Sequence, residues 1–250
     1  MVKTLKINIL RLWLTLDSVL NKADAEKIRG HLGNLFWDNP YAHHHNRDGS
    51  FMYRYPNVQY KVIDGKCLLI GFNEGSEIVE KTFYNLKTIN LNGVWEEILG
   101  KGLESYTNSF TVISDQIQYS SLTPWLALNE KNYQKYQRMG TWGERKELLE
   151  SILVGNIISM SKSLGYTVPE PIKADIGRLK EVPTKLKGTP MLGFLGTFSV
   201  NFEIPDYWGI GKSVSRGFGT ILKQTADNRQ SDDRQQITDK LTAGRKAINE

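Results

Sequence analysis

The chain has 250 residues, of which 40% are hydrophobic and 24% charged, a composition that argues against a disordered or membrane-embedded chain and suits one large or two small domains. Its 32 Lys and Arg against 27 Asp and Glu give a net charge of +5, which permits a polyanionic partner without requiring one. The single cysteine, Cys67, rules out an internal disulfide framework and a Cys-cluster metal site, and it fits a reducing cytoplasm.

The N-terminal segment contains one short apolar run. Lys3, Lys6, Asn8 and Arg11 interrupt this run, and no small-residue cleavage site follows it. We therefore expect a strand here and not a targeting segment. No stretch of the sequence approaches the roughly 20 apolar residues that a membrane-spanning helix needs, so we expect a cytoplasmic protein without membrane association.

The first predicted elements are a strand and a helix. Residues 3–14 alternate partly between apolar and polar side chains, as a half-buried strand does. Residues 24–36 instead repeat apolar side chains at every fourth position, which predicts a helix. The expected inward positions of this helix are Ile28, Leu32 and Phe36.

A hairpin, a second helix and another strand follow. Two runs of β-branched and aromatic residues within residues 58–72 are joined by Asp64-Gly65, which is typical of a two-residue hairpin turn. Ser76 suits the N-cap of a helix over residues 76–86, and strand-like content returns in residues 88–99. The inward positions of the helix are expected to be Ile78, Phe83 and Leu86. The order β-α-β-β-α-β is the ferredoxin-like order of RNA-recognition modules.

The second half begins again with a strand and a helix. Residues 106–128 are rich in Thr, Val, Ile and Tyr, and residues 144–164 predict a long helix. Residues 173–202 contain short β-type runs between Pro and Gly residues, as in a hairpin or meander.

These patterns predict an α+β fold with tandem ferredoxin-like (RRM-like) domains and a C-terminal glycine-rich loop. We place the N-terminal domain at residues 1–102 and the C-terminal domain at residues 103–223. Residues 224–250 are polar and lack aromatic side chains, so they offer too little apolar surface to offset the entropy of ordering. We expect this tail to be disordered.

All four histidines lie between His31 and His45, and three of them, His43, His44 and His45, are contiguous. One interpretation is a solvated loop without a role, because Asn, Asp, Gly and Pro surround the triplet. A second is metal binding, since neutral imidazole is a good ligand. However, adjacent histidines of an extended segment point to opposite sides, and no H-E-x-x-H motif is present. We predict no native metal site and no cofactor.

A third interpretation is acid–base catalysis on RNA. The nucleophile in RNA self-cleavage is the substrate's own 2′-hydroxyl, so the protein needs only a base, an acid and a group that stabilises the phosphorane. His43 and His45 share a face if the segment is extended. Tyr53 and Arg54 follow closely enough to supply a phenol and a cation, and Arg54 is also a candidate RNA-binding residue. His31, on the predicted helix, should matter less directly.

A glycine-rich segment occupies residues 206–222. Its glycines allow a backbone to approach a phosphate closely, and its basic side chains add charge, although a structural turn between strands would explain the glycines equally. A Walker A motif is excluded because Asp206 stands where that motif needs glycine. The candidate RNA-binding residues in this segment are Gly209, Gly211, Lys212, Ser213, Arg216, Gly217 and Gly219.

Aromatic and basic residues are interleaved in residues 51–56 and again in residues 132–146. Such a composition permits base stacking together with phosphate neutralisation. Because aromatic side chains are more often core residues than stacking platforms, the pattern identifies no single stacking residue.

Four segments taken together resemble the CRISPR-associated repeat endoribonucleases, the Cas-six family, in its histidine-rich type I-B-like branch: HLGNLF, NPYAHHH, YRYPNVQYKVIDGK and GIGKSVSRGFGTI. The resemblance covers most of residues 1–223. It implies tandem ferredoxin-like domains, binding of CRISPR repeat RNA, and metal-independent cleavage of precursor transcripts that leaves a 2′,3′-cyclic phosphate and a 5′-hydroxyl.

By motif position, the resemblance implies that His43 and His45 are the acid–base pair and Tyr53 a supporting hydroxyl. His44 is an alternative catalytic residue, because the resemblance does not fix the register within the triplet. The implied partners are precursor and mature guide RNA, with other interference-complex subunits and a homodimer left open. The alternatives are a non-catalytic repeat-binding subunit with the same domains and a histidine-loop metalloprotein.

Overall fold

The computed structural model describes residues 4–39, 41 and 54–225. The first half contains β1 (Leu5–Leu16), α1 (Asp24–Leu35), β2 (Val58–Ile63), β3 (Lys66–Phe72), the 3₁₀ helix η1 (Asn73–Gly75), α3 (Ser76–Asn85) and β4 (Thr88–Leu91). The second half contains β5 (Val94–Ser121), α4 (Glu130–Arg138), α5 (Trp142–Ser163), β6 (Ala174–Leu186), β7 (Thr189–Glu203), the 3₁₀ helix η2 (Val214–Arg216) and β8 (Ile221–Lys223).

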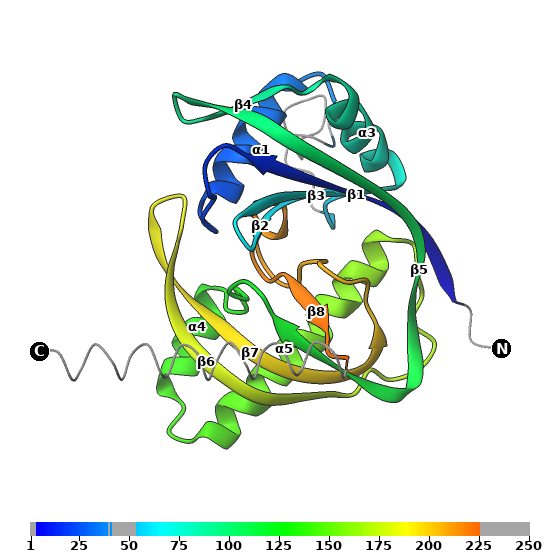
Figure 1. Ribbon diagram of the computed structural model, residues 1–250. Coiled ribbons are helices and arrows are strands. Elements are labelled where there is room, and N and C mark those ends of the chain that lie inside the picture. Colours follow the sequence, from blue (N-terminus) through cyan, green and yellow to red (C-terminus); the bar gives the residue numbers. More distant parts are fainter. Residues whose placement is uncertain (1–3, 40, 42–53, 226–250) are drawn as a thin grey trace, which may run out of the picture.

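The first half is a ferredoxin-like unit, as the sequence predicts. Its strands lie in the order β2-β3-β1-β5, with neighbouring strands antiparallel. Helices α1 and α3 cover one face of this sheet (Figure 1), where Leu12 and Leu14 of β1 pack with Ile28 and Leu32 of α1. The predicted hairpin is confirmed, since Asp64-Gly65 joins β2 to β3 with positive φ angles at both residues.

Two local predictions for the first half are wrong. Ser76 is not an N-cap, because η1 runs directly into α3 and the preceding Gly75 takes the cap position with a helical backbone. Phe83 is only half-buried, because α3 turns Ile78, Val79 and Thr82 toward the sheet. The other two predicted inward positions, Ile78 and Leu86, are buried, so only the prediction for Phe83 is wrong.

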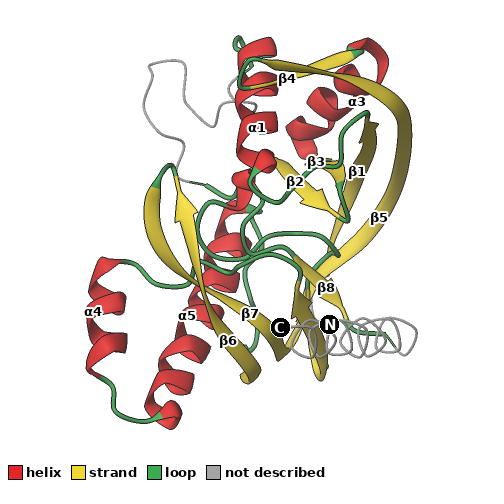
Figure 2. Cartoon of the chain, turned by 60° about the vertical axis from the view of Figure 1, so that its left-hand side comes forward, coloured by secondary structure: helices red, strands yellow, loops and turns green. Residues whose placement is uncertain are grey.

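The fourth strand of the first sheet belongs to a strand far longer than the sequence suggests. Residues 88–99 form a hairpin between β4 and the start of β5, not one strand. β5 is 28 residues long, and beyond its pairing with β4 it pairs with β1 and then with β7 and β8. In Figures 1 and 2, β5 curves along one side of the molecule and joins the two halves. The expected domain boundary at residues 102 and 103 lies within this strand.

The second half repeats the sheet order in β8-β5-β7-β6. The predicted long helix is α5, which begins with a capping box between Thr141 and Glu144. The predicted hairpin is β6 and β7. A second ferredoxin-like helix is missing between β7 and β8 in the described chain, and the glycine-rich segment takes its place. The tail beyond residue 225 lies outside the described residues.

The two halves share one hydrophobic core beneath the glycine-rich segment. Trp208 of this segment stacks on Phe72 of β3, with ring centroids 4.4 Å apart, and contacts Tyr55 and Phe110. All four side chains are buried. Since strands of the first half form one wall of this core, the glycine-rich segment has a fixed position between the halves. Among residues 4–39, 41 and 54–225, no helix has the length and apolar character needed to cross a bilayer.

Candidate functional site

The glycine-rich segment is held by hydrogen bonds from both halves of the chain. Gly209 of this segment donates its N–H to Gln59 Oε1 at 3.0 Å and accepts a 2.8 Å bond from the Tyr55 hydroxyl. Gln59 belongs to β2 and Tyr55 lies just before β2, so both bonds hold the segment on the first half of the chain. Gly219 donates to the carbonyl of Pro124 at 2.9 Å. These buried bonds preform the segment, so little ordering should be needed when a ligand binds.

Packing within the protein accounts for two of the glycines. At Gly211, where φ is +83°, a Cβ atom would lie 2.6 Å from the ring of Trp125. At Gly217, where φ is +86°, it would lie 2.9 Å from the Cβ of Ala25. Both positions combine a left-handed backbone with a close neighbour, which only glycine accommodates without strain. These glycines therefore do not by themselves indicate a phosphate, and the polar side chains between them carry the case for a ligand.

A buried lysine supports the segment from below. Lys61 of β2 is fully buried, and its Nζ donates to Thr220 Oγ1 at 3.1 Å. The Thr220 hydroxyl in turn donates to the carbonyl of Gly217, which also accepts a 2.6 Å bond from Thr123 Oγ1. Burial lowers the pKa of Lys61 to about 7. The amino group thus titrates near neutrality at the base of the glycine-rich segment.

The lowered pKa of Lys61 predicts a pH-dependent stability. Between about pH 7 and the ordinary lysine pKa, the unfolded chain binds a proton that the folded chain does not, so the free energy of unfolding should rise with pH, by at most about 1.4 kcal/mol per pH unit. Lys61→Met should reduce this slope, and Lys66→Met, at an exposed position of the same hairpin, should not. Urea unfolding at pH 7, 8 and 9 measures the dependence of the free energy of unfolding on pH for each variant. Parallel profiles for wild type and Lys61→Met would contradict the titration.

An ion pair joins the segment to the first helix. Arg216 Nε lies 3.0 Å from Glu26 Oε1 of α1, and the arginine side chain is only 18% exposed. This contact uses one of the five N–H groups of the guanidinium. Arg29 of α1 lies close by, and burial together with the charge of Arg216 lowers its pKa. Two guanidinium groups therefore gather at this edge of α1, which favours an anionic ligand.

A cavity of about 470 Å³ brings Arg54 beside the glycine-rich segment. Ser213, Ser215 and Arg216 of the glycine-rich segment also line it. Ser213 is the N-cap of the short η2 turn and has a left-handed backbone, with φ at 58°. Arg54 directly follows residues 42–53, here called the histidine segment, so the structure brings a residue next to this segment together with the glycine-rich segment. The predicted residues within the histidine segment lie outside the described part of the chain: His43, His44, His45 and Tyr53.

A second cavity, of about 390 Å³, is also lined by Arg216 and lies between α1 and the β6–β7 hairpin. Lys22 and Lys185 line it together with Arg216, and Lys22 Nζ donates to the carbonyl of Leu122 at 2.7 Å. Sequence reasoning missed Lys22, Arg29 and Lys185. Each resembles an ordinary surface cation when taken alone, and only the fold gathers them, so the net positive charge was the one available signal.

His31 lies away from both cavities. Its ring contacts Trp95 edge-on, with centroids 5.8 Å apart, and burial lowers its pKa. His31 lies on α1, as the sequence predicts, and its smaller contribution relative to the triplet stays a prediction. Within the described part of the chain, no group of three or more His, Cys, Asp and Glu side chains is arranged to hold a metal ion.

Comparison with known families matches both halves of the chain. Residues 5–109 match the Cas6b N-terminal domain, and residues 111–224 match the Cas6b C-terminal domain. A crystal structure of Cas6b is 38% identical, with a TM-score of 0.82, and the match covers 88% of this chain and all of that one. A second structure, of a CRISPR RNA processing endoribonuclease Cas6b, is 35% identical over the same shares, with a TM-score of 0.71.

Two further relatives are less informative. An uncharacterized protein of Methanocaldococcus jannaschii is 45% identical over 139 residues, which cover 56% of this chain and 94% of that protein. The type IV Cas6 crRNA endonuclease Csf5 covers 88% of this chain and all of its own at 11% identity, with a TM-score of 0.58, and shares the fold alone.

Proposed function

Because the chain belongs to the Cas6b family, we propose that it is an endoribonuclease that binds CRISPR repeat RNA and cuts the precursor transcript into guide RNAs. The observation that carries the proposal is a cavity lined both by Arg54, which is next to the histidine segment in sequence, and by Ser213 and Arg216 of the glycine-rich segment. A cation beside a preformed, basic loop suits a phosphodiester.

RNA binding is assigned to the basic side chains around the two cavities. Lys22 and Lys185 line one of them together with Arg216, and Arg54 lines the other. Lys212 precedes the left-handed Ser213 and is exposed. Cations in this arrangement neutralise successive phosphates along a strand, which gives affinity and register without reading sequence.

Cleavage is assigned to the histidine segment. In this proposal one imidazole, of His43 or His45, removes the proton of the substrate's 2′-hydroxyl, whose oxygen attacks the neighbouring phosphorus. The bond from phosphorus to the 5′-oxygen breaks, and the other imidazole protonates that oxygen. The products are a 2′,3′-cyclic phosphate and a 5′-hydroxyl, and no step requires a metal ion.

Supporting roles follow from charge and position. Arg54 is suited to stabilise the extra negative charge of the phosphorane, and Tyr53 to hold a phosphate oxygen or orient an imidazole. His44 replaces one member of the pair if the register of the triplet is shifted by one residue. These assignments extend the family relationship to the individual residues of this chain.

Removing charge from the glycine-rich segment should weaken RNA binding. In the double variant Lys212→Ala with Arg216→Ala, the slope of log affinity against log salt should become shallower by about 0.7 to 0.9 for each phosphate that the protein no longer neutralises. Lys81→Ala with Lys87→Ala, at two exposed positions around α3, removes the same charge and serves as the control. Filter binding between 50 and 300 mM salt measures both.

Retention of the fold is checked by thermal unfolding of each variant, because Arg216→Ala also removes the ion pair with Glu26. Unchanged affinity and salt slope in a folded Lys212→Ala, Arg216→Ala double variant would show that the glycine-rich segment has a structural role and does not bind RNA through these side chains.

A further inference from the structure

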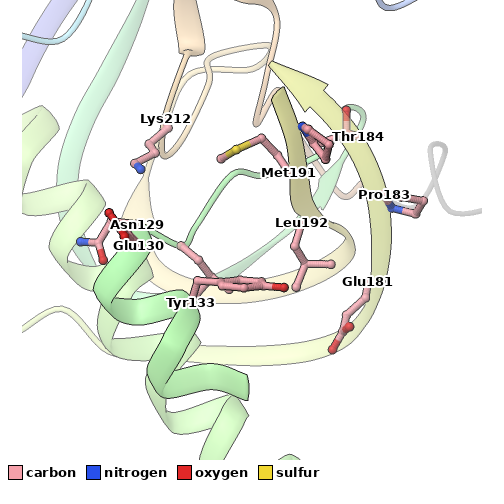
Figure 3. Close-up of a pocket in the computed structure, with 11 residues that line it drawn as sticks. Asn129, Glu130, Tyr133, Glu181, Pro183, Thr184, Met191, Leu192 and Lys212 are labelled. Atoms are coloured by element: carbon pink, nitrogen blue, oxygen red, sulfur yellow. The ribbon is translucent and has the colours of Figure 1, made fainter. Parts of the chain in front are cut away.

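A third cavity, of about 740 Å³, lies against the β6–β7 hairpin. Its lining includes the apolar side chains of Leu128, Met191 and Leu192, together with Tyr133 of α4 and Lys212 of the glycine-rich segment. Figure 3 shows Tyr133 and Leu192 next to each other, with Met191 and Lys212 above them in this view. Nothing in the proposed cleavage chemistry uses this cavity.

Tyr133 is held in place by the packing of α4 and stays partly exposed in the cavity. Tyr136, one turn after Tyr133, is fully buried, packs on Phe194 at 5.6 Å and donates its hydroxyl to Glu181 Oε1 at 2.6 Å. This contact fixes α4 on the hairpin. Tyr133 then projects from the same helix with 45% of its surface exposed. The cavity is therefore preformed, with an aromatic ring available for stacking.

The polar residues that line the cavity are Asn129, Glu130, Glu181, Thr184 and Lys212. Asn129 caps α4 by accepting a 2.8 Å bond from the Asn132 N–H at its Oδ1, and an amide of this kind keeps its NH₂ group as a donor. Glu181 is engaged by Tyr136 and by Arg145, which lies 3.6 Å away. Lys212, whose backbone N–H is fixed to the carbonyl of Leu126 at 3.2 Å, adds a cation at the rim.

We propose that this cavity binds one unpaired nucleobase of the RNA, with Tyr133 stacking on the base and Lys212 binding an adjacent phosphate. A base has flat apolar faces and a polar edge, which match a lining that combines an aromatic ring and apolar side chains with an amide donor and a cation. The proposal rests on the RNA-binding function proposed above and adds a subsite to it.

The glycine-rich segment links this subsite to the cleavage site. Lys212 lines the base-binding cavity, whereas Ser213 to Arg216 line the cavity that contains Arg54. A strand that crosses the segment can therefore place one nucleotide in the first cavity while its neighbours pass Arg54. A base captured here fixes the register of the RNA relative to the catalytic groups, which is valuable because small misplacements slow catalysis strongly.

The test is a double-mutant cycle between protein and RNA. Repeat RNA made uncleavable by one 2′-deoxy nucleotide is prepared as a series with a single abasic nucleotide at each position, and its affinity is measured with wild type, Tyr133→Ala and Trp142→Ala. Trp142 is the matched control, because it is 46% exposed on α5 and does not line the cavity. One abasic position should lower the affinity of wild type and Trp142→Ala by about 5- to 150-fold, but that of Tyr133→Ala much less.

The outcomes separate this proposal from the proposed function. If wild type binds and cuts the repeat but every abasic effect is the same in Tyr133→Ala, the base-binding subsite is overturned and the endoribonuclease proposal stands. The same profile is expected if a protein segment occupies the cavity, and it would likewise overturn the subsite. If wild type does not bind the repeat at all, both proposals fail.

Discussion

Replacing His43 or His45 with alanine is expected to slow single-turnover cleavage of the repeat RNA by about 10²- to 10⁴-fold, the usual contribution of a general acid or base. Affinity for uncleavable RNA should change little, because binding is assigned to the basic side chains around Arg54 and Arg216. Enzyme in excess over RNA isolates the chemical step, and equilibrium binding to 2′-deoxy RNA reports affinity separately.

Three further variants define the roles. His44→Ala tests the register of the triplet, and Tyr53→Phe should have a smaller effect, because water partly replaces a hydroxyl that only orients or stabilises. His31→Ala is the control, since this histidine packs on Trp95 away from the Arg54 cavity.

The wild-type rate should be bell-shaped in pH, with both limbs belonging to the histidine pair jointly. Unchanged rates, or decreases in rate matched by equal decreases in affinity, would mean that the histidine segment binds RNA without catalysing its cleavage.

A single 2′-deoxy nucleotide immediately upstream of the cut should abolish cleavage and leave binding nearly intact. The reason is chemical: the substitution removes the nucleophile itself, whereas removing one protein group only slows its activation. The same substitution one nucleotide farther upstream is the control and should be cut at close to the normal rate. Cleavage of the substituted RNA at the original position would show that water or another external nucleophile attacks the phosphate.

Much of the fold was predictable because local chemistry determines it. Asp64-Gly65 predicts the β2–β3 hairpin because both turn residues adopt positive φ, and the apolar spacing of α1 matches its buried face. Ser76 resembles an N-cap in sequence but is none, because η1 already supplies a helical backbone before it. Local sequence does not reveal such a continuous turn.

The continuity of β5 could not be predicted from the sequence. Gly100 and Gly102 resemble strand breaks, but in the sheet they pair with Thr15 and Trp13 of β1, and the ladder runs through them. The two halves are therefore separate in their packing but are joined by one continuous strand. The continuity of β5 depends on its partners in neighbouring strands, which are distant in the sequence.

The candidate site was only partly predictable. The resemblance joins the histidine segment to the glycine-rich segment, and the structure places Arg54 next to Ser213 and Arg216. Lys61 and the cavity beside Tyr133 depend on tertiary packing. A lysine in an alternating strand gives no local sign that it will be buried beneath a distant loop, where it contacts Thr220, 159 residues later in the chain.

The most direct test of the central claim is incubation of the purified wild-type protein, without a His-tag, with the repeat RNA of its own CRISPR array in excess EDTA. The claim predicts one specific cut, with a 2′,3′-cyclic phosphate on the upstream fragment and a 5′-hydroxyl on the downstream fragment. Tight binding without any cut would identify a non-catalytic repeat-binding subunit. A strict requirement for added divalent metal, or a 3′-hydroxyl on the upstream fragment, would contradict the proposed mechanism.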